Sequence, residues 1–276
     1  MGGWTKHPMK KLLVLLTAMV TGFSALRAQR SDEVGVFIGG SYYVGDLNPS
    51  GHLNSLTRPA MGVVYRHNFN MRLSVAGSLL FGSIQGIDAR SSSYEQQQRN
   101  LSFRSSLYEL AARAEFNFIE YKIGDDRYQF TPFMFLGVAG FNFNPRASIG
   151  NQWVALQPLK TEGQSKAYMR TQVSVPFGAG IKANMAKRIG LVIEWGLRKT
   201  FTDYLDDVST TYADPATLQA NGGPLAVALA DRSTTTRENT GRQRGNPRNK
   251  DWYSYAGLTL TFQLQARPKH CSAYGL

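Results

Sequence analysis

Apolar and polar residues alternate along several stretches of the chain with a period of two. Over residues 108–118 one set of alternate positions is apolar or aromatic, whereas the set between them carries Glu109, Arg113 and Glu115. Successive side chains of a β-strand point to opposite faces, so this segment would have one apolar and one charged face. A helix would mix the two sets around its circumference. The pattern therefore predicts a strand.

Seven further stretches predict strands on the same grounds. The alternation is clear over 72–81, 173–184, 191–198 and 256–263, it is weaker over 34–44 and 59–69, and 130–144 is apolar on both faces. The facing of that last stretch stays open at the level of sequence. The sequence predicts eight strands in all.

The connections between these strands alternate in length. The short ones are residues 67–70, 121–127 and 185–188, and the long ones are 45–58, 86–100, 145–170 and 202–250. This alternation is typical of an up-and-down outer-membrane barrel, in which short turns are periplasmic and long loops extracellular. We therefore expect an all-β fold, an eight-stranded antiparallel up-and-down transmembrane β-barrel. An even number of strands would place both termini in the periplasm.

The composition of the two faces decides which one points into the barrel. Lipocalin-like soluble barrels also have eight strands, but they enclose the apolar face. In this chain the polar face combines small and charged residues, namely Gly178, Gly180, Gly196 and Gly257 with Arg113, Glu115, Lys182, Glu194 and Arg198. Such a face suits a narrow interior filled by paired charges, and the Phe-, Leu-, Val- and Trp-rich face suits lipid. We expect Glu109, Arg113, Glu115, Glu194 and Arg198 to pair across a closed lumen, because an unpaired buried charge is costly.

The beginning of the chain has the character of a secretory signal peptide. Lys6, Lys10 and Lys11 precede a short apolar run over 12–20, and small residues follow toward Ala28. We therefore predict a signal peptide over 1–28, a barrel domain over 29–264 and a periplasmic tail over 265–276. Removing residues 1–28, which hold four Lys or Arg and no acid, would lower the formal net charge from +12 to +8.

Much of the net positive charge that remains lies in one stretch, residues 232–250. Such a run is also found in nucleic-acid-binding proteins. In an exported protein we expect instead a solvated loop close to anionic lipid headgroups, and no nucleic-acid partner.

Candidate chemistry is sparse in the mature chain. Cys271 is the one cysteine, so disulfides within the chain and cysteine-based metal sites are excluded. The histidines (His52, His67 and His270) show no Ser-His-acid arrangement at sequence spacing. The acids Asp203, Asp206 and Asp207 lack the glycine and the final glutamate of a calcium loop, and we expect them to be solvated. We predict no catalytic, cofactor-binding or metal-binding residues, no cofactor, and no enzymatic activity.

Three stretches resemble a known family. They are Arg-Ser-Ser-Leu-Tyr-Glu-Leu-Ala over 104–111 with Glu-Phe-Asn-Phe over 115–118, Glu-Trp-Gly-Leu-Arg-Lys-Thr-Phe-Thr-Asp-Tyr-Leu-Asp-Asp-Val-Ser over 194–209, and Arg-Gly-Asn-Pro-Arg-Asn-Lys-Asp-Trp-Tyr over 244–253. Together they resemble the DUF6089 family of Bacteroidetes outer-membrane barrels. The resemblance implies a non-enzymatic barrel of the type IX (Por, or gliding-linked) secretion machinery, associated with a periplasmic ring of the lipoprotein PorK and its partner PorN. The alternative is a stand-alone surface barrel for membrane integrity, adhesion or small-ligand binding.

Overall fold

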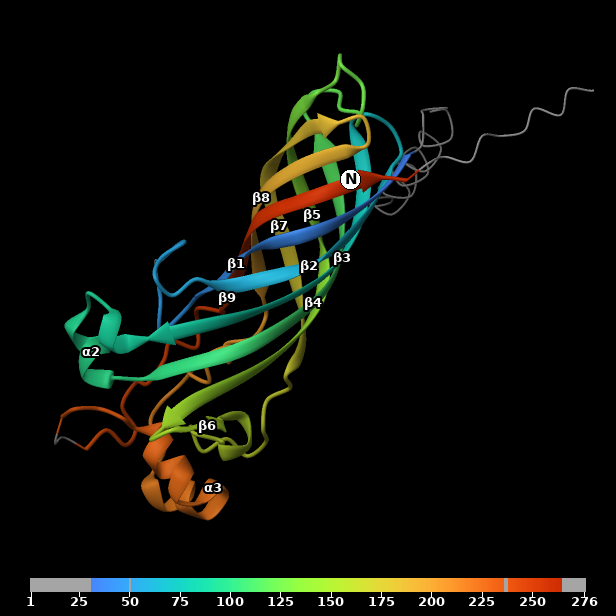
Figure 1. Ribbon diagram of the computed structural model, residues 1–276. Coiled ribbons are helices and arrows are strands. Elements are labelled where there is room, and N and C mark those ends of the chain that lie inside the picture. Colours follow the sequence, from blue (N-terminus) through green and yellow to red (C-terminus); the bar gives the residue numbers. More distant parts are fainter. Residues whose placement is uncertain (1–30, 50, 236–237, 265–276) are drawn as a thin grey trace, which may run out of the picture.

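The computed structural model describes residues 31–49, 51–235 and 238–264 and has the form of a closed antiparallel β-barrel (Figure 1). The strands of this part of the chain are β1 (Ser31–Val44), β2 (Arg58–Asn68), β3 (Leu73–Ile87), β4 (Ser102–Asn117), β5 (Phe130–Ile149), β6 (Gln152–Ala155), β7 (Thr171–Ala186), β8 (Ile189–Thr200) and β9 (Trp252–Gln263). All but β6 form the barrel wall, in which each strand pairs with the next and β1 pairs with β9. The predicted eight-stranded, all-β fold is confirmed. The predicted signal peptide and tail lie outside the described residues.

The strand register places the two faces as the composition indicates. Ile193 lies opposite Leu258 on the outer face and is 48% exposed, whereas its neighbour Glu194 is 4% exposed and points inward. The structure also determines the facing of residues 130–144, the stretch that is apolar on both faces. Phe133 and Phe135 of β5 point into the barrel, and Met134 points out of it.

The predicted alternation of connection lengths is present. The short connections are 69–72, 118–129 and 187–188, and the long ones are 45–57, 88–101, 150–170 and 201–251. The connection over 118–129 is longer than predicted because β4 ends at Asn117 and β5 begins at Phe130. The first and last described residues lie at the short-turn end, and the helices lie at the other end (Figure 1). No helix in the described ranges is long and apolar enough to cross a membrane.

The wall extends further toward the long-loop end than the sequence predicts. Residues 86–87 and 145–149, expected to be loop, belong to β3 and β5, because pairing with β4 continues to Ile87 opposite Ser102 and to Arg146 opposite Arg104. The short strand β6 folds back onto the end of β5. The long connections also hold helices that the sequence did not predict: η2 (Asp88–Arg90), α2 (Tyr94–Arg99), η3 (Gln157–Leu159) and α3 (Pro215–Ala230).

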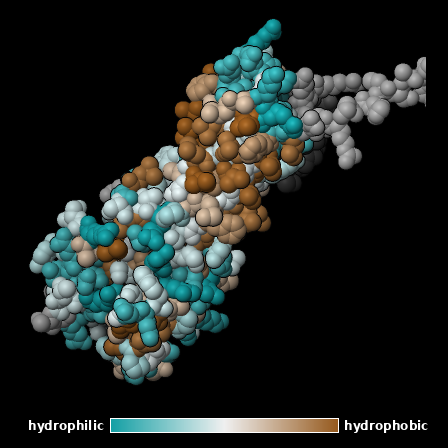
Figure 2. Space-filling view, in the orientation of Figure 1, coloured by the Kyte–Doolittle hydropathy of each residue, from teal (hydrophilic) through white to brown (hydrophobic). Residues whose placement is uncertain are grey.

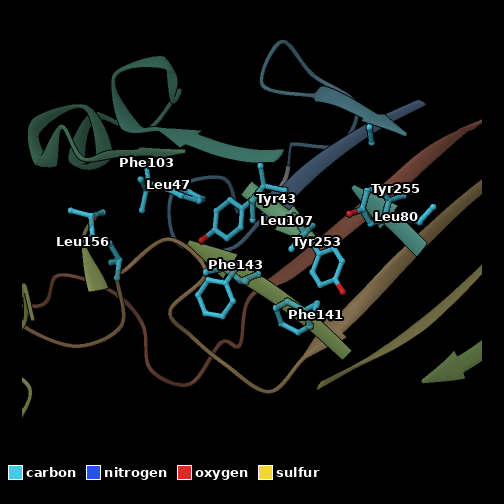
Figure 3. Packing of buried hydrophobic residues seen from close by; sticks show 14 of the residues in the cluster. Tyr43, Leu47, Leu80, Phe103, Leu107, Phe141, Phe143, Leu156, Tyr253 and Tyr255 are labelled. Carbon is cyan, nitrogen blue, oxygen red and sulfur yellow. The ribbon is translucent and has the colours of Figure 1, made fainter. Parts of the chain in front are cut away.

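The mouth of the barrel at the long-loop end is filled by a hydrophobic core (Figure 3). Aromatic side chains from the wall meet across it, with the rings of Tyr43 and Phe103 5.0 Å apart and those of Phe141 and Tyr253 also 5.0 Å apart. Leu205 and Val208, from connection 201–251, are fully buried in the same core. The longest connection is therefore packed into the barrel mouth rather than projecting freely from it.

An apolar band covers the outer face of the wall between two more polar ends (Figure 2). Aromatic side chains border it at both edges. Those toward the short turns are Phe69, Phe116, Phe118, Phe130 and Phe262, and those toward the long loops are Phe81, Tyr108, Phe177 and Trp252. From Tyr108 to Phe118 the chain advances ten residues. At about 3.3 Å per residue and a strand tilt of about 40°, that gives a band about 25 Å high.

Candidate functional site

The barrel interior is crossed by a network of buried ion pairs centred on Glu115 of β4. Its carboxylate accepts hydrogen bonds from Arg66 Nε and Lys182 Nζ, each at 2.7 Å, and from Arg113 Nε at 3.0 Å. Arg66 also binds Glu33 at 2.7 Å. Four strands, β1, β2, β4 and β7, are therefore tied together across the lumen by one connected set of charges.

Two further pairs continue the network along the barrel axis. Arg113 donates two hydrogen bonds of 2.7 Å to the carboxylate of Glu194, in the bidentate geometry that suits guanidinium and carboxylate. Nearer the long loops, Arg198 binds Glu109 at 3.1 Å, and Tyr253 donates to the same carboxylate at 2.8 Å. The pairing predicted from the sequence for these charges is confirmed.

Among the buried side chains of the described wall, four cations face four carboxylates in the lumen, so the formal charges of these eight residues cancel. The cations are Arg66, Arg113, Lys182 and Arg198, and the carboxylates are Glu33, Glu109, Glu115 and Glu194. Two members, Glu33 and Arg66, were not predicted from the sequence. Glu33 lies just before the stretch in which the alternation of β1 was recognised. Arg66 lies in a weakly patterned strand, although Val64, Arg66 and Asn68 share its inner face.

Phenylalanine rings fill the space beside these charges. Arg113 lies 4.6 Å from the ring centroid of Phe135, and Lys182 lies 4.6 Å from that of Phe133. A Cβ at Gly178 or Gly196 would come within 2.7 or 2.5 Å of the Phe135 ring, so these positions need glycine to admit it. The small residues of the inner face thus make room for aromatic side chains, and the interior is packed rather than open.

A second polar cluster lies where the longest connection enters the barrel mouth, and we call the folded connections at this end the loop cap. The Tyr43 hydroxyl lies 2.5 Å from Asp206 Oδ2 and 3.0 Å from Asp251 Oδ1. A hydroxyl has one proton to donate, so one of these contacts requires a proton on the carboxyl group. Burial raises the pKa of both Asp206 and Asp251 well above the usual range, which favours that proton.

The neighbouring Asp207 joins two connections within the cap. It accepts hydrogen bonds from Thr161 Oγ1 at 2.5 Å and from the Tyr168 hydroxyl at 2.7 Å, and burial raises its pKa to about 6. Arg244 lies 4.0 Å from Asp207 and binds Glu162 at 3.0 Å. These contacts fasten connection 201–251 to connection 150–170.

Two expectations about the long loop were therefore wrong. Asp203, Asp206 and Asp207 are buried rather than solvated, because the connection that carries them is packed into the barrel mouth. Burial also raises the pKa of Asp203 to about 6. Arg244, in the basic stretch expected to be solvated, is buried for the same reason.

The described residues hold no group of three or more His, Cys, Asp or Glu side chains arranged to bind a metal ion. His52 Nδ1 lies 3.1 Å from the Tyr42 hydroxyl, and His67 Nδ1 lies 2.6 Å from Asp32 Oδ1. His270 lies outside the described residues. A cavity of about 560 Å³ opens between α2 and connection 201–251, lined by Tyr94, Gln96 and Gln243 among others.

Several solved structures are similar to this chain. Ail, the attachment invasion locus protein of Yersinia pestis, in complex with the heparin analogue sucrose octasulfate, is 11% identical with a TM-score of 0.42, over 85% of this chain and 99% of that one. Neisserial surface protein A is 7% identical with a TM-score of 0.41, over 84% and 97% of the two chains. The outer membrane protein OprG from Pseudomonas aeruginosa is 8% identical with a TM-score of 0.40, over 86% and 99%. Because these likenesses are weak, the barrel is established by the strand register of the chain itself.

At the level of sequence, one family model matches most of the chain. It is described as "Domain of unknown function (DUF6089)" and matches residues 10–221. The match covers the wall from β1 to β8 and ends within α3. No curated protein matches the sequence.

Proposed function

The chain belongs to the DUF6089 family, and on that premise we propose that it is a non-enzymatic barrel of the bacterial outer membrane. In this proposal residues 1–28 are a signal peptide, 29–264 form the barrel, and 265–276 form a periplasmic tail. The long loops are extracellular, and both termini are periplasmic.

The observation that carries the proposal is the apolar outer band with its aromatic borders. Its height of about 25 Å agrees with the apolar band of outer-membrane barrels, which also has aromatic girdles at both edges. Exposing such a band to water would be costly, whereas lipid solvates it. A sheet that spans a membrane must also leave no backbone hydrogen-bonding group unpaired in lipid. The described wall is closed by pairing of β1 with β9, so no strand edge of the barrel is left unpaired.

The filled lumen determines what kind of role such a barrel can have. Ion pairs and phenylalanine rings occupy the interior, so a polypeptide cannot pass through it. We infer that the chain serves as an anchor in the type IX secretion machinery, the role implied by the likeness to PorG, the best-known member of the family. Its partners would be the periplasmic ring lipoprotein PorK and PorN.

The contact surface for such a ring would be the short-turn end. This end carries polar side chains in the described turns, including Arg72 with Glu120 at 3.8 Å and Lys122 with Asp125 at 3.9 Å. The segment before Val34 and the tail over 265–276 would add to it. A barrel of this size offers little other periplasmic surface.

Co-purification from detergent-solubilised outer membranes tests this role. We expect the tagged full-length chain to recover PorK and PorN, and truncation after Gln265 to weaken that recovery. Deleting the gene should leave cargo with C-terminal sorting domains inside the cell. Normal export in the deletion strain, with no ring proteins recovered, would contradict the secretion role while leaving the membrane location intact.

A stand-alone surface barrel is the second candidate, and the loop cap favours it. The cap is ordered by buried polar contacts, and the cavity of about 560 Å³ beside α2 is large enough for a small polar ligand. A screen of glycans and peptides against the purified chain would separate the two candidates. A specific ligand for the cap, together with normal export in the deletion strain, would favour the surface role.

A further inference from the structure

A second, smaller cavity lies on the outer side of the wall, where β1, β8 and β9 reach the long-loop end. Its volume is about 260 Å³. Val44, Lys199 and Trp252 line it from the strands, and residues 45–46, 49 and 248–250 line it from the loops. Trp252 pairs with Val44 on one side and with Lys199 on the other, so these three side chains are cross-strand neighbours.

The lining of this cavity is strongly basic. Lys199, Arg248 and Lys250 contribute three cations, and Asp46 is the one acid among the lining residues. Within the described part of the chain, none of these cations forms an ion pair with a carboxylate within 4 Å. The Lys199 ammonium lies 4.4 Å from the centroid of the Trp252 ring, and Lys250 donates to the Pro247 carbonyl at 3.0 Å.

The one acid in the lining, Asp46, already has a hydrogen-bond partner within the protein. Asp46 Oδ2 accepts a hydrogen bond of 2.8 Å from the backbone N–H of Asn246. Burial also raises the pKa of Asp46, which makes this carboxylate easier to neutralise than an exposed one. The cavity therefore presents a net positive lining to any group that enters it.

The position of the cavity relative to the apolar band indicates what that group is. Trp252 packs edge-to-face against Phe177 at 6.0 Å, and both belong to the aromatic border toward the long loops. Lys199 lies two residues beyond Leu197 on the outer face of β8. Lysine and arginine just outside an aromatic girdle lie at the level of the lipid headgroups.

We propose that this cavity binds the phosphate of an anionic lipid headgroup in the outer leaflet. The proposal rests on the membrane location given under the proposed function. Lys199, Arg248 and Lys250 would bind the phosphate oxygens through charge-assisted hydrogen bonds. The side chains of Val44 and Trp252 would contact the less polar part of the lipid, an arrangement that favours a lipid headgroup over free phosphate.

The test uses the full-length chain reconstituted in phosphatidylcholine nanodiscs with a trace of fluorescent bis-phosphorylated lipid A. We expect the triple variant Lys199→Gln, Arg248→Gln, Lys250→Gln to bind this lipid at least tenfold more weakly than the parent. Lys166→Gln, which removes an exposed cation of the long-loop end outside the cavity, is the matched control and should bind as the parent does. Dephosphorylated lipid A should bind the parent as weakly as the phosphorylated lipid binds the triple variant.

Competition with inorganic phosphate distinguishes a lipid headgroup from free phosphate as the ligand of the cavity. If millimolar phosphate leaves lipid A binding intact, the lipid headgroup is the ligand. If phosphate displaces the lipid and binds equally well in lipid-free detergent, the proposal is overturned in favour of free phosphate. Equal lipid binding by the parent and the triple variant would also overturn it.

Fractionation of cells that produce the parent and the triple variant separates failure of this inference from failure of the proposed function. If both proteins are in the outer membrane but bind lipid A equally, the membrane barrel stands and the lipid site does not. If the parent itself is absent from the outer membrane, the proposed function fails and the lipid site fails with it.

Discussion

The substitution Glu115→Gln tests whether the lumen is a dry, charge-balanced interior. It keeps the size of the side chain but removes the charge that three cations share, at 2.7, 2.7 and 3.0 Å. Arg66 would retain Glu33 and Arg113 would retain Glu194, whereas Lys182 would lose its one carboxylate partner among the described residues. The main cost would therefore come from a buried ammonium left without a counter-ion.

The expected loss follows from the burial of the network. All the side chains involved are 4% exposed or less. Removing one partner of a buried ion pair typically costs about 3–5 kcal/mol, and we expect Glu115→Gln to lower the free energy of unfolding by that amount. Glu120→Gln is the matched control. Its carboxylate is 43% exposed and lies 3.8 Å from Arg72, so we expect a change of about 1 kcal/mol or less.

Urea unfolding of the full chain in lipid vesicles, followed by tryptophan fluorescence and by the mobility of folded protein on gels, would measure both variants. The double variant Glu115→Gln, Lys182→Met restores the charge balance and places an apolar side chain beside Phe133. It should recover at least half of the loss, because replacing a buried pair with apolar side chains is often close to neutral. If Glu115→Gln costs no more than Glu120→Gln, the interior is wet and the reasoning fails.

Three further predictions concern the outer face, the loop cap and the topology. If Ile193 lies near mid-membrane, Ile193→Arg should lower the free energy of unfolding of the barrel by about 2–4 kcal/mol in the same urea assay. No loss would place this face in water. Burial raises the pKa of Asp207 from its ordinary value of 3.8 to about 6, so the folded cap binds this proton more tightly than the unfolded chain does. The stabilisation by this proton is complete below about pH 4 and is lost as the pH rises through 6. Amide exchange in connection 201–251, corrected for intrinsic rates, should therefore be slower at pH 5 than at pH 7. The variant Asp207→Asn should reduce this difference. An epitope inserted at the exposed Asn221 should be accessible on intact cells, and one at Asp125 only after the outer membrane is breached; the opposite pattern would invert the barrel.

The strands of the wall and the direction of their side chains could be predicted because each strand has one face in the packed lumen and one on the apolar outside. These two environments require polar and apolar residues to alternate with a period of two. Arg113, Glu115 and Glu194 alternate with apolar outer residues, and a slip of one residue would turn every side chain to the wrong face. The facing could not be predicted for β5, where both faces are apolar. There the inward Phe133 and Phe135 pack beside the charges of Arg113 and Lys182, which local sequence cannot reveal.

The loop cap could not be predicted, because its structure depends on contacts between distant connections. Asp207 has its hydroxyl partners in connection 150–170, and Asp206 has its partner in β1. These acids were expected to be solvated because polar loop residues usually are. The helix α3 within the predicted connection 202–250 was missed as well; it contains residues 222–224, and Gly223 adopts a φ of 70° at a kink before Pro224.

A spin label at Ile193 tests whether the apolar face of the wall is in contact with lipid. The label would be attached to Ile193→Cys in a Cys271→Ser background, in the full-length chain reconstituted in lipid vesicles. Power-saturation EPR then compares collisions with oxygen, which concentrates in lipid, and with a water-soluble nickel chelate. Ile193 is exposed on the outer face opposite Leu258, so we predict high accessibility to oxygen and low accessibility to the chelate. The reverse result would show that this face is in water, and the membrane barrel would be wrong.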